Sequence, residues 1–200
     1  MSETHGWPMS AVRNIIGAAW LAGLIDGDGS ITVHIIIRRG GKITLRPLVI
    51  IADYSADCKN IRVVKKLLDD WRITYRVDDG GHRLTVNGWT EALALLERLA
   101  PFLVGKKDQA ELLIRLCKLR LKRLSRGFRM WLRYYTPEEI EIAVKIRRMS
   151  LRRTARSREI DELALKIAEE LRSHAREDVG YGEETYHEEG EAQDSRQGPD

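Results

Sequence analysis

The stretch LAGLIDGDG, residues Leu21 to Gly29, decides the fold, because a helix-forming pattern changes to a strand-forming pattern there. Residues 12–26 are apolar with clustered small side chains, which predicts a helix that packs closely against a neighbour. Residues 30–38 alternate apolar and polar side chains, which predicts a half-buried strand. We therefore expect Asp26 and Asp28 at the junction between a helix and a sheet.

The same kind of pattern continues to about residue 100. Arg39-Gly40-Gly41 predicts a hairpin turn, Pro47 a bend or an edge, and Ser55 or Asp57 a helix cap. The remaining expected elements are a strand at 42–52, a helix at 59–71, short strands at 73–77 and 83–87, and a helix at 90–99 stopped by Pro101. Residues 12–100 thus predict an αββαββα unit with an antiparallel sheet, which is an α+β fold.

One face of this predicted sheet is polar and basic. Its side chains are Thr32, His34, Arg38, Lys42, Thr44, Arg46, Arg76 and Arg83. Such a face has the size that a duplex would occupy, and its arginines could pair with guanine edges or phosphates. An ordinary solvated face is the alternative interpretation.

Beyond residue 105 the chain is mainly helical and basic. Arginines and lysines between Arg115 and Arg133 are interleaved with aromatic residues, which predicts either phosphate contacts or solvated helix charges. Thr136-Pro137-Glu138-Glu139 has the pattern of a capped helix start, and Ser157 is the expected cap of a last helix that runs to about His174. The expected organisation is an N-terminal extension at 1–11, a core at 12–105, a basic helical part of the same domain at 106–176 and an acidic disordered tail at 177–200.

Charge is divided unevenly along the chain. Residues 177–200 hold nine acids and one base, a net charge of −8, while the rest carries +12. A body this basic attracts polyanions, so nucleic acid is the expected partner. No apolar run is long enough for a membrane span, and the first residues lack a secretory pattern, so we expect an intracellular protein of the cytoplasm or nucleoid. Cys58 and Cys117 have no spacing typical of zinc sites or disulfides.

Leu21–Gly29 resembles the LAGLIDADG motif of homing endonucleases in every position except Gly27, where the family has alanine. Residues 100–110 are similar to the family segment that follows the second hairpin. The resemblance implies a saddle-shaped antiparallel sheet with additional C-terminal helices, and metal-dependent cleavage of both strands of DNA.

The resemblance also implies the residues of the site. Asp28 is the expected metal-binding carboxylate and Gly27 adds its carbonyl, with Mg²⁺ as the cofactor and Mn²⁺ or Ca²⁺ as substitutes in binding. Lys106 is the expected catalytic lysine, and Lys107 is the second choice. Asp53 is a weak choice for the catalytic residue that positions water, because the family often has glutamine there. Asp26 is expected to form hydrogen bonds near the helix end.

The chain has one such motif, and family members with one motif act as homodimers. Two motif helices packed together would bring two carboxylates to a two-fold axis, where cations relieve their repulsion. The predicted dimer interface is Ala18, Leu21, Ala22 and Ile25. The expected partner is a long pseudo-palindromic double-stranded DNA site. The alternatives are an RNA maturase that assists intron splicing and a DNA-binding relative that has lost cleavage.

Overall fold

The computed structural model describes residues 9–55, 57–78, 80–125, 134–150 and 154–180. Its elements in chain order are α1 (Met9–Asp28), β1 (Ser30–Ile37), β2 (Ile43–Ala52), α2 (Lys59–Asp70), β3 (Arg76–Val77), β4 (Arg83–Val86), α3 (Trp89–Leu99), η1 (Ala100–Phe102), α4 (Lys107–Ser125), α5 (Pro137–Arg148) and α6 (Ala155–Gly180). The predicted αββαββα unit is confirmed. No helix within these ranges has the length and apolar character that crossing a bilayer requires.

The four strands form one antiparallel sheet in the order β1-β2-β4-β3. The first hairpin turns where it was predicted, because Gly40 and Gly41 adopt φ angles of 80° and 73°, a left-handed conformation that suits glycine. Pro47 lies in β2 just before the pairing with β4 begins at Val49. Its missing N–H therefore leaves no gap in that ladder, which agrees with the predicted edge.

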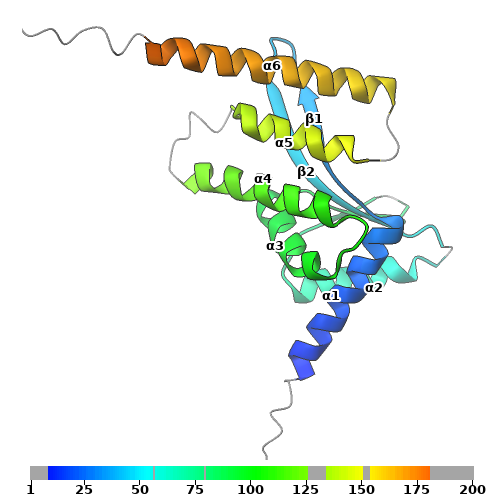
Figure 1. The fold of residues 1–200 in the computed structure, drawn as a ribbon. Coiled ribbons are helices and arrows are strands. Elements are labelled where there is room, and N and C mark those ends of the chain that lie inside the picture. The colour runs from blue at the N-terminus through cyan, green and yellow to red at the C-terminus, as the bar shows by residue number, and fades with distance from the viewer. Residues whose placement is uncertain (1–8, 56, 79, 126–133, 151–153, 181–200) are drawn as a thin grey trace, which may run out of the picture.

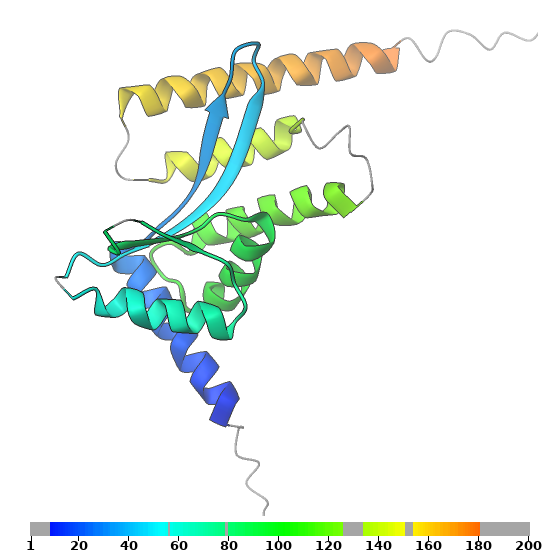
Figure 2. The same ribbon diagram turned by 180° about the vertical axis from the view of Figure 1, so that it is seen from behind.

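The helices cover one face of the sheet. The side chains of β1, β2 and β4 on that face are buried, and they include Ile31, Val33, Leu45, Val49, Leu84 and Val86. The helices α4, α5 and α6 lie against β1, and α1 and α3 lie against β2 (Figure 1). Seen from behind, the β1–β2 hairpin has no helix in front of it (Figure 2). One face is thus the core and the other is open.

Gly29 fixes the way in which α1 enters the sheet. A Cβ at this position would lie 2.7 Å from Ile25 Cα and 2.9 Å from the carbonyl oxygen of Ile50. No side chain fits between two backbones at those distances. The end of α1 can therefore lie directly against β2 only with glycine there, and this contact places Asp26 and Asp28 at the sheet's rim.

Arg147 of α5 connects the C-terminal helices to the sheet. Its Nε donates to Asp161 Oδ1 of α6 at 2.6 Å, and its Nη1 donates to the carbonyl oxygen of Val33 at 3.4 Å. Val33 opposes Pro47 in β1, the outermost strand. Arg38 N donates to the Lys42 oxygen, so these two residues form a hydrogen-bonded pair, and such pairs recur at every second residue along β1. Val33 falls in a pair that is not hydrogen-bonded, and its carbonyl therefore points away from β2. Arg147 thus binds a backbone acceptor that the sheet leaves open.

The caps of two helices differ from the prediction. Neither Ser55 nor Asp57 caps α2. Cys58 holds the N-cap position with φ 47°, and the Asp53 carboxylate accepts from Asn60 N at 2.9 Å instead. In α6 the cap is Thr154, whose Oγ1 accepts from Ser157 N at 3.1 Å. Ser157 is wrong as a cap because its own hydroxyl accepts from Arg147.

The start of α5 is the predicted one: Thr136 and Glu139 form a capping box. At the other end, α6 continues through Gly180, four residues into the segment predicted to be a disordered tail. Residues 181–200, which make up the remainder of that tail, lie outside the described residues.

Candidate metal and nucleic-acid site

Asp26 connects the end of α1 to the start of α4. Its carboxylate accepts three backbone hydrogen bonds, from Val104 N at 2.7 Å, Lys106 N at 2.9 Å and Gly105 N at 3.1 Å. Burial acts to raise the pKa of Asp26, but these three donors and the Lys106 charge outweigh it, so the pKa lies below its ordinary value. The first acid of the motif is therefore occupied by hydrogen bonds, as expected.

Lys106 returns to the same helix end. Its Nζ donates to the carbonyl oxygen of Ile25 at 2.8 Å and to that of Asp26 at 2.5 Å. These oxygens belong to the last turn of α1, where carbonyls lack partners within the helix and a positive charge is favourable. The structure thus brings a lysine that is 80 residues away in sequence to the motif.

Asp28, the last residue of α1, is exposed. Within the described residues its carboxylate has no hydrogen-bond or ion-pair partner, in contrast to Asp26. Gly27 before it is also exposed. One open carboxylate next to an accessible backbone carbonyl fits Mg²⁺, which prefers few carboxylates and keeps water and phosphate oxygens as its other ligands.

A complete metal cage is not built by one chain. Among the described residues, no group of three or more histidine, cysteine, aspartate or glutamate side chains converges to hold an ion. Asp28 and Gly27 would supply only part of a coordination shell.

Asp53 is at the end of β2 and 7% exposed. Its Oδ1 accepts from the hydroxyl and the backbone N–H of Ser55, and its Oδ2 accepts from Asn60 N. The Ser55 hydrogen bonds are the main cause that lowers the pKa of Asp53. The carboxylate thus organises the loop before α2, and in the part of the chain described it makes no contact with Asp28 or Lys106.

His82 and Cys58 pack beside this loop. His82 Nδ1 lies 3.1 Å from both the Cys58 sulfur and the Asp53 carbonyl oxygen, and the ring stacks on Tyr54. These contacts join the second hairpin to the loop that leads into α2. Lys59 at the start of α2 pairs with Asp57 at 2.7 Å.

The open face of the sheet carries the predicted polar residues in register. His34 lies opposite Arg46, and Arg76 lies opposite Thr85. The face also contains side chains that the sequence reasoning did not select, namely Ile36, Leu48, Ile50 and Thr85. The same alternation that selected Arg46 and Arg83 could have found them. Apolar groups on such a face can contact thymine methyl groups in a major groove.

The bases of the open face and those of the helices have different surroundings. In the described residues, Arg38, Lys42, Arg46, Arg76 and Arg83 are exposed and no acid forms an ion pair with any of them. Several helical bases are paired within the chain: Arg115 with Glu138, Lys118 with Glu97, Arg123 with Glu139, Arg147 with Asp161 and Arg172 with Glu141. Other exposed helical bases of the described residues, such as Lys65, Lys66 and Lys122, form no ion pair, so the open face is distinguished by having its bases together on one surface.

Of the bases of α4 predicted to contact phosphates, one is enclosed by the fold. Arg120 is buried, stacks at 4.1 Å over the Tyr135 ring and donates to the Tyr134 carbonyl oxygen. Arg115 and Lys118 already hold carboxylates. The rest of the predicted stretch, residues 126–133, lies outside the described residues.

The predicted dimer interface is buried within the single chain. Ala18 is 5% exposed and Leu21, Ala22 and Ile25 are 0% exposed, because these side chains form the core between α1 and the sheet. They have no surface left for a second copy, so the assignment is wrong for these four residues. The opposite side of α1 is exposed instead, and it carries Ile16, Ala19, Trp20, Gly23 and Gly27.

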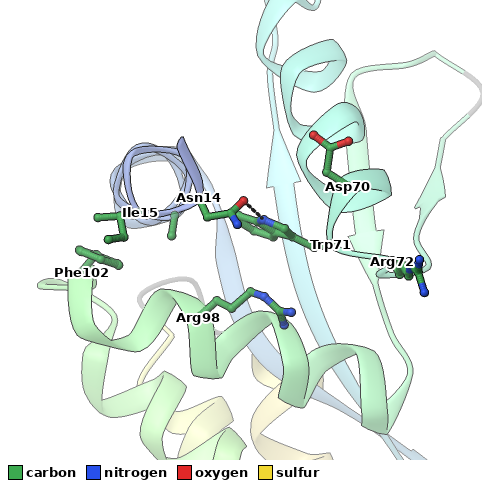
Figure 3. Close-up of a pocket in the computed structure, with 8 residues that line it drawn as sticks. Asn14, Ile15, Asp70, Trp71, Arg72, Arg98 and Phe102 are labelled. Carbon is green, nitrogen blue, oxygen red and sulfur yellow. Dashed lines mark hydrogen bonds between the residues drawn. The ribbon is translucent and has the colours of Figure 1, made fainter. Parts of the chain in front are cut away.

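A hollow of about 460 Å³ lies beside the first half of α1 (Figure 3). Trp71 at the end of α2 forms its floor, donating from Nε1 to Asn14 Oδ1 at 3.3 Å with Arg98 beneath the ring. Asn14 is 14 residues before Asp28, which is about 21 Å along a helix. The hollow therefore belongs to the packing of α1 on α2 and α3 and is remote from the acids of the motif.

No model of a known protein family matches the chain. Its sequence is similar to the DNA endonuclease I-CvuI of Chlorella vulgaris, with 29% identity over 102 residues, and the match covers 50% of this chain and 63% of that protein. Its motif resembles LAGLIDADG, and its fold is that of the homing endonucleases described next.

Three solved structures show the likeness of fold. I-CvuI in complex with its target, in the presence of Ca, has a TM-score of 0.57 and 23% identity over 78% of this chain and 97% of that one. The archaeal intron-encoded homing endonuclease I-Vdi141I complexed with DNA has a TM-score of 0.54 and 19% identity, covering 76% of this chain and 96% of that one. The homing endonuclease I-TnaI has a TM-score of 0.53 and 16% identity, covering 75% of this chain and 97% of that one.

Proposed function

We propose that this chain is a site-specific DNA endonuclease of the homing type, which makes a metal-dependent double-strand break at a long pseudo-palindromic site. The observation that carries the proposal is the contrast at the end of α1: Asp26 is fully engaged and Asp28 is open, while Lys106 donates to the carbonyl oxygens of the same helix end. The relatives named above, which are endonucleases, support it.

Asp28 and the Gly27 carbonyl would hold Mg²⁺, with Mn²⁺ or Ca²⁺ as substitutes in binding. Bound there, the ion supplies charge stabilisation and an activated water at the scissile phosphate. Lys106 is held at the end of α1 by two carbonyl oxygens, so its ammonium group can stabilise negative charge that develops on the phosphate. Asp26 positions Lys106 because its carboxylate accepts hydrogen bonds from the backbone N–H groups of residues 104 to 106. Asp53 holds the neighbouring loop.

The open face would bind the duplex. Its unpaired bases are arranged along β1, β2 and the second hairpin, so they can neutralise phosphates, while His34, Thr32 and Thr44 can reach base edges. Leu48 and Ile50 would add apolar contacts. Arg115, Arg123 and Arg147 of the helices are held by the chain's own acids.

The proposed active form is a homodimer joined through α1. Gly23 and Gly27 lie on its exposed side, and a Cβ at either position would meet no atom within 4 Å. A glycine inside a helix destabilises it by about 0.5–1 kcal/mol relative to alanine. Nothing in the described chain requires glycine at these two positions, whereas a second α1 could approach closely there. The dimer would also bring together two Asp28 carboxylates.

The test uses the Asp28→Asn variant, with Asp70→Asn as a matched exposed acid at the end of α2. The substrate is a supercoiled plasmid carrying the DNA on both sides of the gene, joined without the gene, with Mg²⁺. We expect linear product from the wild type and from Asp70→Asn, and a loss of about 100-fold or more in Asp28→Asn. Duplex binding in Ca²⁺ should remain in all three. Equal cleavage by Asp28→Asn, or tight RNA binding without any cutting, would contradict the proposal.

A further inference from the structure

The C-terminal segment from Tyr181 to Asp200 is far more acidic than the rest of the chain. It contains seven acids and one arginine, a net charge of −6 over 20 residues. The open face of the sheet has the opposite charge, because its arginines and Lys42 have no acidic partner among the described residues. These two features are complementary, and they belong to one chain.

The helix that leads into this segment passes the tip of the first hairpin on the helix-covered side of the sheet. Leu171 and His174 of α6 line the same hollow, of about 510 Å³, as Arg39 and Lys42 of the hairpin turn. Glu170 also lines it but makes no ion pair with either base. From His174, α6 continues to Gly180, about 9 Å further along the axis. To reach the open face, the acidic segment must therefore pass back around the hairpin tip.

Length is no obstacle to contact. Twenty residues can span at most about 66–72 Å when extended, and as an unstructured linker they would cover about 25 Å on average. Both distances exceed the length of the last helix turns that separate the segment from the hairpin. A tethered segment at this range has an effective concentration on the order of millimolar.

We propose that residues 181–200 bind the open face of the sheet in the absence of DNA, where their carboxylates take the positions of backbone phosphates. The segment would contact Arg38, Arg39 and Lys42 at the hairpin tip first, and any duplex must displace it. The inference that DNA is the displacing ligand rests on the proposed function. The contact itself does not.

Such a competitor weakens binding to every duplex by the same factor, because it reduces the fraction of molecules whose open face is unoccupied. Non-specific sites, with dissociation constants on the order of 10⁻⁴ to 10⁻⁶ M, would then be left largely empty. A specific site binds more tightly by about three to seven orders of magnitude and would remain filled. The segment would thus suppress random occupancy without abolishing target binding.

The first test detects the contact without nucleic acid. A zero-length carbodiimide links carboxylates to nearby lysines in the full-length protein, and peptide mass spectrometry locates the links. We expect links from Glu183, Glu184, Glu188 or Glu189 to Lys42 at about five times the yield of links to Lys65 and Lys66, which are exposed on α2. A random 30-base-pair duplex should suppress them, and Lys42→Arg should remove them. Equal yields at all three lysines would overturn the proposal.

The second test measures competition. The tail variant carries Glu→Gln at 183, 184, 188 and 189. Its control carries Asp70→Asn, Glu111→Gln, Glu159→Gln and Glu162→Gln, which are four exposed acids outside the site with the same total charge. We expect the tail variant to bind the random duplex about tenfold more tightly at low salt with a steeper salt dependence, and the control to change less than about twofold. Equal tightening in both would show an effect of net charge alone and would contradict the proposal.

The two tests separate this inference from the proposed function. If the Lys42 links form but no duplex binds, the proposed function fails and the contact stands. If duplex is bound and cut but the links are absent and the tail variant behaves as its control does, the function stands and the tail contact fails.

Discussion

Asp26 and Asp28 are two residues apart and have opposite surroundings. Asp26 accepts three backbone N–H groups, while Asp28 has no partner in the described part of the chain. The sequence was sufficient to predict this difference, because the resemblance assigns a structural role to the first acid and a metal to the second. It could not have predicted the donors, since Val104 and Gly105 are nearly 80 residues away and only folding brings them near.

We predict that Asp26→Asn lowers stability in a pH-dependent way. The folded-state pKa of Asp26 is depressed, so its contribution is fully present above the ordinary value of 3.8 and is lost as the pH falls through the folded-state pKa. At pH 7 the variant should lose about 1–3 kcal/mol of unfolding free energy, because an amide cannot accept all three hydrogen bonds as a carboxylate does.

Urea unfolding of wild type and variant at pH 7 and at pH 3 would measure this difference, which should shrink at the lower pH. Asp28→Asn is the matched control, and its unfolding free energy should change little at either pH. A constant loss at both pH values in Asp26→Asn would mean that the charge of Asp26 is not what the backbone donors stabilise.

At the scale of elements, α1 has two faces with different tasks. Leu21, Ala22 and Ile25 close the core, while Ile16 and Trp20 remain 63% and 37% exposed on the other side. Sequence reasoning placed the interface on the core side because the small and apolar residues surround the whole helix, so periodicity alone could not tell which side meets the sheet. The contacts of β1 and β2 decide it.

We predict that Gly23→Leu prevents dimer formation while leaving the single chain folded. The added side chain meets no atom of its own chain within 4 Å of the Cβ, so it should clash only with a second α1. Sedimentation velocity should show a dimer for the wild type and a monomer for the variant, with unchanged circular dichroism.

Gly17→Leu serves as the contrasting variant, because a Cβ at Gly17 would lie 2.8 Å from Leu67 Cδ2 inside the chain. It should lower the unfolding free energy directly. If Gly23→Leu remained dimeric, the helix face proposed here would not be the interface.

For the whole molecule, the bases of the open sheet face form no ion pairs in the described residues, while several bases of the helices are paired with acids. Composition predicted a basic body and the alternation predicted which strand residues share a face. In α4 the sequence spacing could not show that Arg120 is enclosed by Tyr135 or that Arg115 meets Glu138 across the fold. Charge along a helix is informative only when its partners are known.

We predict that Arg46→Gln reduces the salt dependence of duplex binding, whereas Arg115→Gln does not. Each phosphate that a base neutralises contributes about one unit to the slope of log affinity against log salt concentration. Arg46 is unpaired on the open face and should lower the slope by about one unit per subunit. Arg115 already binds Glu138 at 2.6 Å, so its loss should leave the slope nearly unchanged.

Fluorescence anisotropy with a random duplex at salt concentrations from about 50 to about 300 mM would measure both slopes. Equal slopes for the two variants would indicate that the duplex does not lie on the sheet.

Arg147 has a further effect that follows from where it binds. The outer edge of a sheet offers open backbone acceptors, and a strand of another molecule can attach to them and start a fibre. The guanidinium group on the Val33 carbonyl, with α5 and α6 packed against β1, closes that route along the middle of the edge. Strand addition at this edge of the sheet is thereby disfavoured.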